Sequence, residues 1–151
     1  MANLMVQQAS LADVKCVAEL FDEYRQFYGQ ASNVPAARDF LLARASQGES
    51  VIFVAKAAER AMGFVQLFPA FSSVSLARTF ILNDLYTRPE GRRGGVATRL
   101  LQAAENYAKA VGAIRLTLST ALTNEPAQAL YRASGWDQDD QFCVFHRAIS
   151  T

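Results

Sequence analysis

The sequence predicts a mixed α/β fold, in which a central, mostly antiparallel sheet with one parallel strand pair carries helices on both faces. Apolar residues recur at helical spacing in four segments, and β-branched and aromatic residues gather in six short segments between them. Their order along the chain is β-α-α-β-β-β-α-β-α-β, without a repeat or linker. We therefore expect residues 1–151 to form a single domain.

The first strand is expected over residues 4–9, followed by a long amphipathic helix. Ser10 and Asp13 have the spacing of a capping box, which marks a helix N-terminus. Apolar residues repeat every three or four positions through residues 11–28, so this segment is expected to be a helix that ends at Gly29.

A second helix and three antiparallel strands are expected next. Pro35 suits the first turn of a helix, which would run to Gly48. Residues 50–57 and 63–71 are rich in β-branched and aromatic side chains and predict a hairpin. Residues 79–87 predict a third strand of the same group.

The last third of the chain alternates helices and strands. Helices are expected over residues 96–111 and 124–134, and strands over 114–120 and 141–149. The unit from residue 79 to 119 reads strand, turn, helix, strand. It should therefore form a right-handed parallel crossover.

Composition limits the classes of partner. The formal net charge of +1 gives no global field toward nucleic acid or a membrane surface, so any anion site must be local. No apolar run approaches the ~20 residues of a membrane helix, and no leader pattern opens the chain, so a cytoplasmic protein is expected. Cys16 and Cys143 fit no C-x-x-C pattern; buried free thiols are expected, with a disulfide left open.

The turn "RPEGRRGG", residues 88–95, precedes the third helix and is suited to an anion. The first N–H groups of a helix have no partner within the helix and lie at the positive end of its dipole. Gly94 and Gly95 let a ligand approach those amides, and Arg92 and Arg93 add charge, which predicts a phosphate site. The glycine spacing matches neither a P-loop nor the G-x-G-x-x-G fingerprint. A solvated loop with capping glycines is the alternative.

Two segments resemble the GCN5-related N-acetyltransferase (GNAT) family, as a single-domain member of bacterial type. The first is Arg92-Arg93-Gly94-Gly95-Val96-Ala97, which fits the R/Q-x-x-G-x-G/A signature and follows a strand end, Leu85-Tyr86-Thr87, similar to the family's fourth strand. The second is "NEPAQALYRASGW", similar to the family's N-x-x-A-x-x-x-Y-x-x-x-G-[FW] segment through Asn124, Ala127, Tyr131, Gly135 and Trp136. The predicted element order also matches the family fold, which has a splayed parallel strand pair.

The resemblance implies acetyl-CoA, or another acyl-CoA, as the donor, and no metal. In the family the turn amides hold the pyrophosphate of CoA. Carried over, the donor-binding residues are those of the turn and of the strand before it: Leu85, Tyr86, Thr87, Arg92, Arg93, Gly94, Gly95, Val96, Ala97 and Thr98. An amide near Leu85 or Tyr86 would polarise the thioester carbonyl.

Asn124 and Tyr131 complete the implied donor site. By resemblance Asn124 bonds the pantetheine arm, and the Tyr131 hydroxyl protonates the leaving thiolate. Asn124 also suits a helix N-cap, and Tyr131 could belong to the core.

A base is needed because an alkyl amine is mostly protonated at neutral pH. Asp84 and Asn83 lie on the strand beside the thioester, Asp84 as the base and Asn83 to orient a water. Strand alternation puts them on opposite faces unless a bulge intervenes. The alternative is that Asp84 is a carboxylate paired with an arginine.

The acceptor is expected to be a small-molecule or peptide amine. Tyr24, Arg25 and Tyr28 at the end of the first long helix are candidates for its pocket, with core packing as the alternative for the two tyrosines. The single histidine, His146, has no ligand partners at metal spacing. No nucleic-acid or membrane partner is expected, and a homodimer is left open. Two rival functions remain: a CoA-sensing module without catalysis, and a generic nucleotide-phosphate binder.

Overall fold

The computed structural model describes residues 3–150 of the chain. The chain divides into two compact units, one that ends at Ser119 and one that begins at Thr120. The first unit contains the whole sheet, and the second contains a single regular helix.

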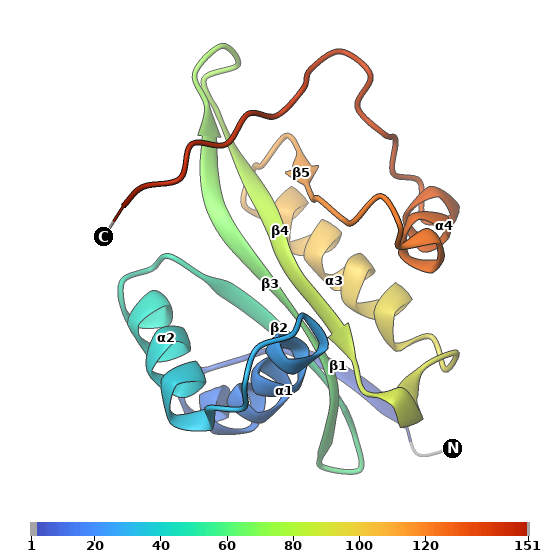
Figure 1. The fold of residues 1–151 in the computed structure, drawn as a ribbon. Coiled ribbons are helices and arrows are strands. Elements are labelled where there is room, and N and C mark those ends of the chain that lie inside the picture. The colour runs from blue at the N-terminus through green and yellow to red at the C-terminus, as the bar shows by residue number, and fades with distance from the viewer. Residues whose placement is uncertain (1–2, 151) are drawn as a thin grey trace. The chain divides into compact units, whose positions relative to one another are not determined.

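The sheet of the first unit has the strand order β1-β2-β3-β4-β5 (Figure 1). Each neighbouring pair is antiparallel except β4 and β5, which are parallel. The strands are β1 (Leu4–Gln8), β2 (Val51–Ala57), β3 (Arg60–Ser72), β4 (Ala77–Thr87) and β5 (Leu116–Thr117). The predicted mixed sheet with a parallel β4-α3-β5 connection is confirmed.

Helices cover both faces of this sheet, as expected. The helices α1 and α3 lie on opposite faces of the sheet (Figure 1). The Phe21 ring of α1 packs on Phe64 of β3, and Tyr107 of α3 packs against Phe80 of β4. The helices are the 3-10 turn η1 (Leu11–Asp13), α1 (Val14–Phe27), α2 (Val34–Ser46), the 3-10 turn η2 (Pro89–Gly91), α3 (Val96–Ala110) and, in the second unit, α4 (Glu125–Ala133).

The N-terminus of the first helical segment is fixed by the predicted capping box. The Ser10 backbone N–H donates to Asp13 Oδ2 at 2.8 Å, which satisfies one amide that the helix itself cannot pair. From there α1 turns its apolar stripe to the sheet, where Val17, Leu20 and Phe64 of β3 have no exposed surface.

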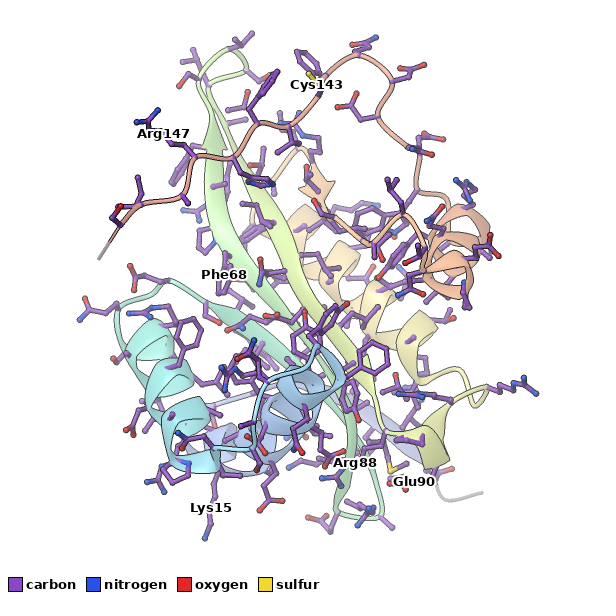
Figure 2. The ribbon with its side chains drawn as sticks, in the orientation of Figure 1. Lys15, Phe68, Arg88, Glu90, Cys143 and Arg147 are labelled. Atoms are coloured by element: carbon purple, nitrogen blue, oxygen red, sulfur yellow. The ribbon has the colours of Figure 1, made fainter. Side chains whose placement is uncertain are left out.

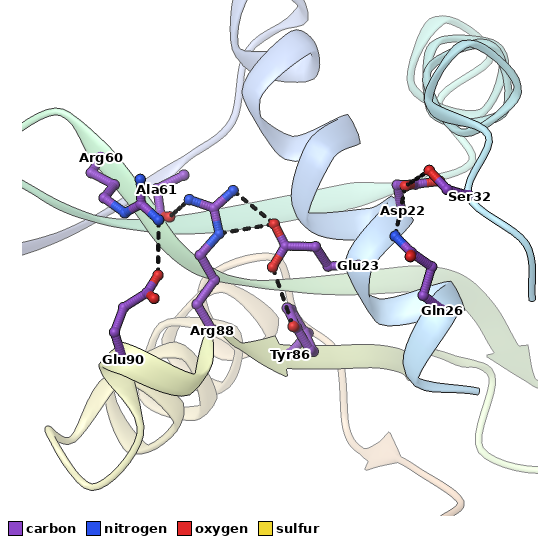
Figure 3. Close-up of polar contacts among 9 residues, drawn as sticks. All are labelled: Asp22, Glu23, Gln26, Ser32, Arg60, Ala61, Tyr86, Arg88 and Glu90. Carbon is purple, nitrogen blue, oxygen red and sulfur yellow. Dashed lines mark hydrogen bonds and ion pairs between the residues drawn. The ribbon is translucent and has the colours of Figure 1, made fainter. Parts of the chain in front are cut away.

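A buried carboxylate fixes the loop between α1 and α2. Asp22 accepts hydrogen bonds from Gln26 Nε2, Ser32 Oγ and the Asn33 backbone N–H, at 2.9, 2.7 and 2.7 Å (Figure 3). Burial alone would raise the pKa of Asp22, but the bonds from Asn33, Ser32 and Gln26 together lower it below its usual range. The carboxylate therefore holds the loop in its ionised form.

The close packing of α3 on the sheet depends on a glycine in β3. A Cβ atom at Gly63 would lie 2.6 Å from the Tyr86 carbonyl oxygen and 3.0 Å from Val96 Cγ1. Only a residue without a side chain fits there. Gly63 thus sets the distance between β4 and the first turn of α3.

Two predicted strands differ from the structure. The strand expected over 114–120 is limited to Leu116–Thr117, and the strand expected over 141–149 is absent, because residues 141–149 have no regular structure. Aromatic and β-branched residues give residues 141–149 strand propensity, but a strand forms only beside a partner, and the described part of the second unit contains no other strand.

Both cysteines are free thiols. Cys16 is partly buried, whereas Cys143 is exposed, which corrects the expectation that both are buried. Within residues 3–150, no helix is both long and apolar enough to cross a bilayer.

Candidate functional site

A bulge in β4 places the acidic candidate. Leu82 pairs with Leu67 of β3 and Asp84 pairs with Gln66, so Asn83 is an extra residue in β4. An extra residue reverses the inward and outward alternation of the strand that follows it. The sequence predicts Asn83 and Asp84 on opposite faces of the sheet unless a bulge intervenes. The structure contains such a bulge.

The reversal turns Asp84 toward α1. Before the bulge, the Phe80 ring packs on Tyr107 of α3 at 5.7 Å. After it, the Tyr86 ring packs on Tyr24 of α1 at 6.2 Å, and Asp84 shares that face by alternation. Asn83 remains exposed while the Asp84 side chain is buried, with 4% of Asp84 accessible.

The second half of β4 has an open edge toward β5, because β5 pairs only with the first half of the strand. The Arg88 N–H donates to the Met62 carbonyl on the β3 side, at 2.8 Å. Alternation then turns the N–H and C=O groups of Leu85 and Thr87 to the open edge, and those of Tyr86 toward β3. The open edge offers backbone donors and acceptors to an extended ligand.

The turn after β4 exposes a set of amides at the N-terminus of α3. Arg93 and Gly95 have positive φ angles of 66° and 81°. Within residues 3–150 the N–H groups of Val96, Ala97 and Thr98 make no hydrogen bond; the first bonded amide of the helix is that of Arg99. A Cβ atom at Gly95 would meet nothing within 4 Å, so the approach to these amides is open.

The side chains around the turn add two cations, and the strand before it carries a buried hydroxyl without a partner among the described residues. Arg92 donates from Nε to the Thr87 carbonyl at 3.1 Å, and its guanidinium lies over the Tyr86 ring at 5.9 Å. Arg93 is exposed. The Thr87 Oγ1 atom is buried and has no hydrogen-bond partner among the described residues. The amides and the two arginines together fit a phosphate-bearing ligand.

An ion-pair cluster fixes the end of β4 against α1. Arg88, 8% exposed, contacts Glu23 Oε2 through two nitrogens and donates to the Ala61 carbonyl at 3.0 Å (Figure 3). The Tyr86 hydroxyl donates to Glu23 Oε1 at 3.3 Å. Figure 2 shows Arg88 and Glu90 at this end of the sheet. The strand that carries the candidate residues is therefore anchored where the turn begins.

Asp84 lies in a network of neutral donors. Gln66 Nε2 donates to its Oδ2 at 2.6 Å, and Asn83 Nδ2 donates to its Oδ1 at 3.1 Å. Burial raises the pKa of Asp84, and the bonds from Gln66, Tyr24 and Asn83 oppose that rise without cancelling it. No arginine or lysine of the described chain forms an ion pair with Asp84, so the alternative of an arginine-paired carboxylate is wrong.

The acceptor candidates at the end of α1 have different surroundings. Tyr24 is partly buried between other rings, and its hydroxyl lies 3.5 Å from the Asn83 carbonyl. Tyr28, 56% exposed, packs edge-on against Tyr24 at 5.1 Å. Arg25 is half-buried, and its charge helps to lower the pKa of Asp22. Tyr24 is thus both a packing residue and a neighbour of the bulge.

The remaining two candidates belong to the second unit. Asn124 is the N-cap of α4, because its Oδ1 accepts the Ala127 N–H at 3.3 Å. Tyr131 is half-buried, with its ring 6.0 Å from that of Trp136. Their roles toward the donor stay predictions.

Sequence reasoning missed the partners of these residues. Gln66 lies in a predicted strand, where a polar residue between apolar neighbours was the available signal. Glu23 and Arg88 are separated by 65 positions, so no local pattern joins them. Among residues 3–150, no group of three or more His, Cys, Asp or Glu side chains is arranged to hold a metal ion.

The fold, the bulge in β4 and the turn before α3 together indicate a protein that binds a phosphate-bearing ligand. Similarity to known proteins identifies its family. The sequence profile of the Acetyltransferase (GNAT) family matches residues 17–136. The chain belongs to this family.

Individual relatives agree with that assignment. An uncharacterized N-acetyltransferase of Bacillus subtilis (strain 168), YhfO, is 45% identical over 137 residues, which cover 91% of this chain and 92% of the relative. A probable acetyltransferase of Haemophilus influenzae is 33% identical over 79% of this chain and 78% of its own. The crystal structure of another probable acetyltransferase has a TM-score of 0.92 and 43% identity, covering 97% of this chain and 99% of its own.

Proposed function

We propose that this protein is an acyl-CoA-dependent N-acetyltransferase that moves an acetyl group from acetyl-CoA to the amine of a small molecule or peptide. In this proposal amine and donor are bound together, and the amine attacks the thioester directly. The observation that carries the proposal is that one unit contains both the unbonded amides of the α3 N-terminus and the open edge of β4, joined by a short turn. The single-domain arrangement of residues 1–151 is part of the proposal.

The donor suits these residues in two parts. Its pyrophosphate would be held by the N–H groups from Arg93 to Thr98 and by the guanidinium groups of Arg92 and Arg93, where helix dipole and side chains are both positive. Its amide-bearing arm would pair with the backbone of Leu85 and Thr87, which the alternation of β4 turns to the open edge. Asn124 is the further residue proposed for the arm.

Acetyl-CoA supplies an activated acyl group in a thioester, and the protein would supply charge and proton control. The Leu85 amide, which alternation turns to the open edge, would stabilise negative charge that develops on the thioester oxygen. Asp84, buried and with a raised pKa, would take the amine proton directly or through a water oriented by Asn83. Tyr131 would donate a proton to the sulfur that leaves. Tyr24, Arg25 and Tyr28 would line the acceptor side.

Calorimetry with matched variants tests the donor site. Asparagine and aspartate both tolerate a positive φ and have nearly the same shape. We expect Gly95→Asn to weaken CoA binding modestly, and Gly95→Asp to abolish it, because a carboxylate would oppose the pyrophosphate. Equal affinity in both variants would exclude an anion at this turn. Tight ATP binding without CoA binding would favour the generic nucleotide binder.

Thiol release from acetyl-CoA with a broad panel of amines separates an enzyme from a sensor. We expect release that depends on the amine added. Release without amine would indicate hydrolysis only. CoA binding without turnover on any amine would favour the CoA-sensing module.

A further inference from the structure

The buried acid of the site is the last member of a hydrogen-bonded chain that begins between α2 and β2. Ser50 Oγ donates to Gln66 Oε1 at 2.6 Å, and Gln66 Nε2 donates to Asp84 Oδ2 at 2.6 Å. Gln66 and Asp84 are directly opposite each other in β3 and β4, just beyond the bulge. Phe68, two residues further along β3, marks this level of the sheet in Figure 2.

The direction of each bond follows from the chemistry of the groups. An ionised carboxylate only accepts hydrogen bonds, so Gln66 must turn its NH₂ group to Asp84. Its carbonyl oxygen then faces Ser50, which can donate because its hydroxyl rotates. Without Ser50 the Gln66 carbonyl oxygen would be buried without this donor, which is unfavourable. Ser50 therefore supports the amide orientation that the Asp84 carboxylate requires.

Gln66, the middle member of this hydrogen-bonded chain, occupies a position where packing alone would favour an apolar residue. Gln66 has no exposed surface, and its neighbours in β3, Val65 and Leu67, are equally buried. A buried amide is unfavourable unless its polar atoms are paired, and a buried network is stable only when it is complete. The chain of polar groups ends at a carboxylate beside the proposed thioester position, which gives the arrangement a chemical use.

We propose that Gln66 and Ser50 are positioning residues for the acetyl transfer: Ser50 pairs the carbonyl oxygen of the Gln66 amide and so supports its orientation, and Gln66 holds Asp84 ionised and aimed toward the amine. This inference rests on the proposed function. The titratable group that faces Asp84 from α1 is the Tyr24 hydroxyl. From β4 the neighbours are Asn83, which is neutral, and Tyr86, which donates to Glu23. Across β3 the neutral Gln66 faces the carboxylate.

The test measures kcat/KM for the amine as a function of pH. Ser50→Ala should move the acid limb of the profile to higher pH by about one unit, because a hydrogen bond that favours the ionised carboxylate is weakened. Ser50→Thr keeps a hydroxyl and should restore the wild-type limb. Ser46→Ala, a hydroxyl at the end of α2 outside the chain, is the matched control and should leave the limb in place. The KM for acetyl-CoA should not change.

A second measurement does not depend on catalysis. Carbon-detected NMR titration of the Asp84 carboxyl should show the same upward displacement in Ser50→Ala, and a larger one in Gln66→Met. If transfer occurs and Ser50→Ala leaves both the limb and the titration unmoved, the positioning role is wrong. If the titration moves but no amine is acetylated by the wild type, the hydrogen-bonded chain is real and the proposed function fails. If only stability falls, the chain is structural and the inference is overturned.

Discussion

Replacing Gly63 with alanine tests how closely α3 must approach the sheet. The added Cβ would lie 2.6 Å from the Tyr86 carbonyl oxygen, 3.0 Å from Val96 Cγ1 and 3.3 Å from Leu100 Cδ1. Ordinary contact begins at 3.4 Å, so the first distance is too short by about 0.8 Å. The two side-chain atoms can move by rotation, but the carbonyl belongs to β4 and can move only with the strand.

The expected loss of stability follows from this short contact with the backbone. Overpacking typically costs about 1–3 kcal/mol, and a clash with backbone should fall near the upper value, about 3 kcal/mol of unfolding free energy. The displaced groups belong to the proposed donor site, since Tyr86 lies between the two residues that face the open edge and Val96 begins α3. A shift of these groups should raise the Kd for CoA about tenfold, equivalent to about 1.4 kcal/mol.

Urea unfolding and calorimetry with CoA measure both effects. Gly112→Ala is the control, because Gly112 follows the end of α3 with φ of 79° and open space around its Cβ position. That variant carries only backbone strain, about 1 kcal/mol, and should bind CoA like the wild type. If Gly63→Ala has wild-type stability and CoA affinity, the close approach of α3 to β4 does not set the geometry of the site.

Three further substitutions probe the buried acids and the proposed proton donor. Asp22→Asn should lower the unfolding free energy at pH 7 by about 2–3 kcal/mol, because three donors lose an ionised acceptor. Because the pKa of Asp22 is lower in the folded state, this stabilisation is present above the unfolded pKa. The difference in stability between wild type and variant should therefore shrink as the pH falls through the folded pKa. An unchanged urea midpoint at pH 7 would contradict this role. Asp84→Asn should have the opposite effect on stability. Because the pKa of Asp84 is raised in the folded state, the stability of the wild type falls as the pH rises from the unfolded to the folded pKa, and the variant should be more stable at pH 7. Acetyl transfer should drop at least ~100-fold in this variant. Retained transfer would remove Asp84 from the mechanism. Tyr131→Phe should lower kcat with little change in CoA affinity, and full activity would exclude its hydroxyl as the proton donor.

Local patterns in the sequence predicted the parts of the site that depend on neighbouring residues. The turn was predictable because glycines, arginines and a helix start lie within a few positions, and the geometry at Gly95 follows from its own φ. The bulge at Asn83 was not, because an extra residue is defined only against a partner strand. Alternation limited the choice between Asn83 and Asp84, and the pairing with β3 decided it in favour of Asp84 as the buried one.

The failed strand over residues 141–149 has the same origin. The segment has aromatic and β-branched residues, as β1 has apolar ones, yet β1 pairs with β2 over its full length while residues 141–149 have no partner strand in the described part of the second unit. Residue types give a segment its strand propensity, but the hydrogen bonds that make it a strand involve another segment.

The two buried aspartates show why the chemistry of a site is harder to predict than its fold. Asp22 and Asp84 both have little accessible surface, at 3% and 4%, but Asp84 lies much deeper in the protein, and their pKa values move in opposite directions. Asp22 is surrounded by donors from its own helix and the next loop, including a backbone N–H that only proline would remove. Asp84 relies on side-chain donors from β3, from α1 and from the adjacent Asn83, and burial remains dominant. A carboxylate bound by a nearby backbone N–H stays ionised and stabilises the fold. A carboxylate that is bound by side chains alone has a pKa that those side chains can adjust, which suits a group that must accept a proton.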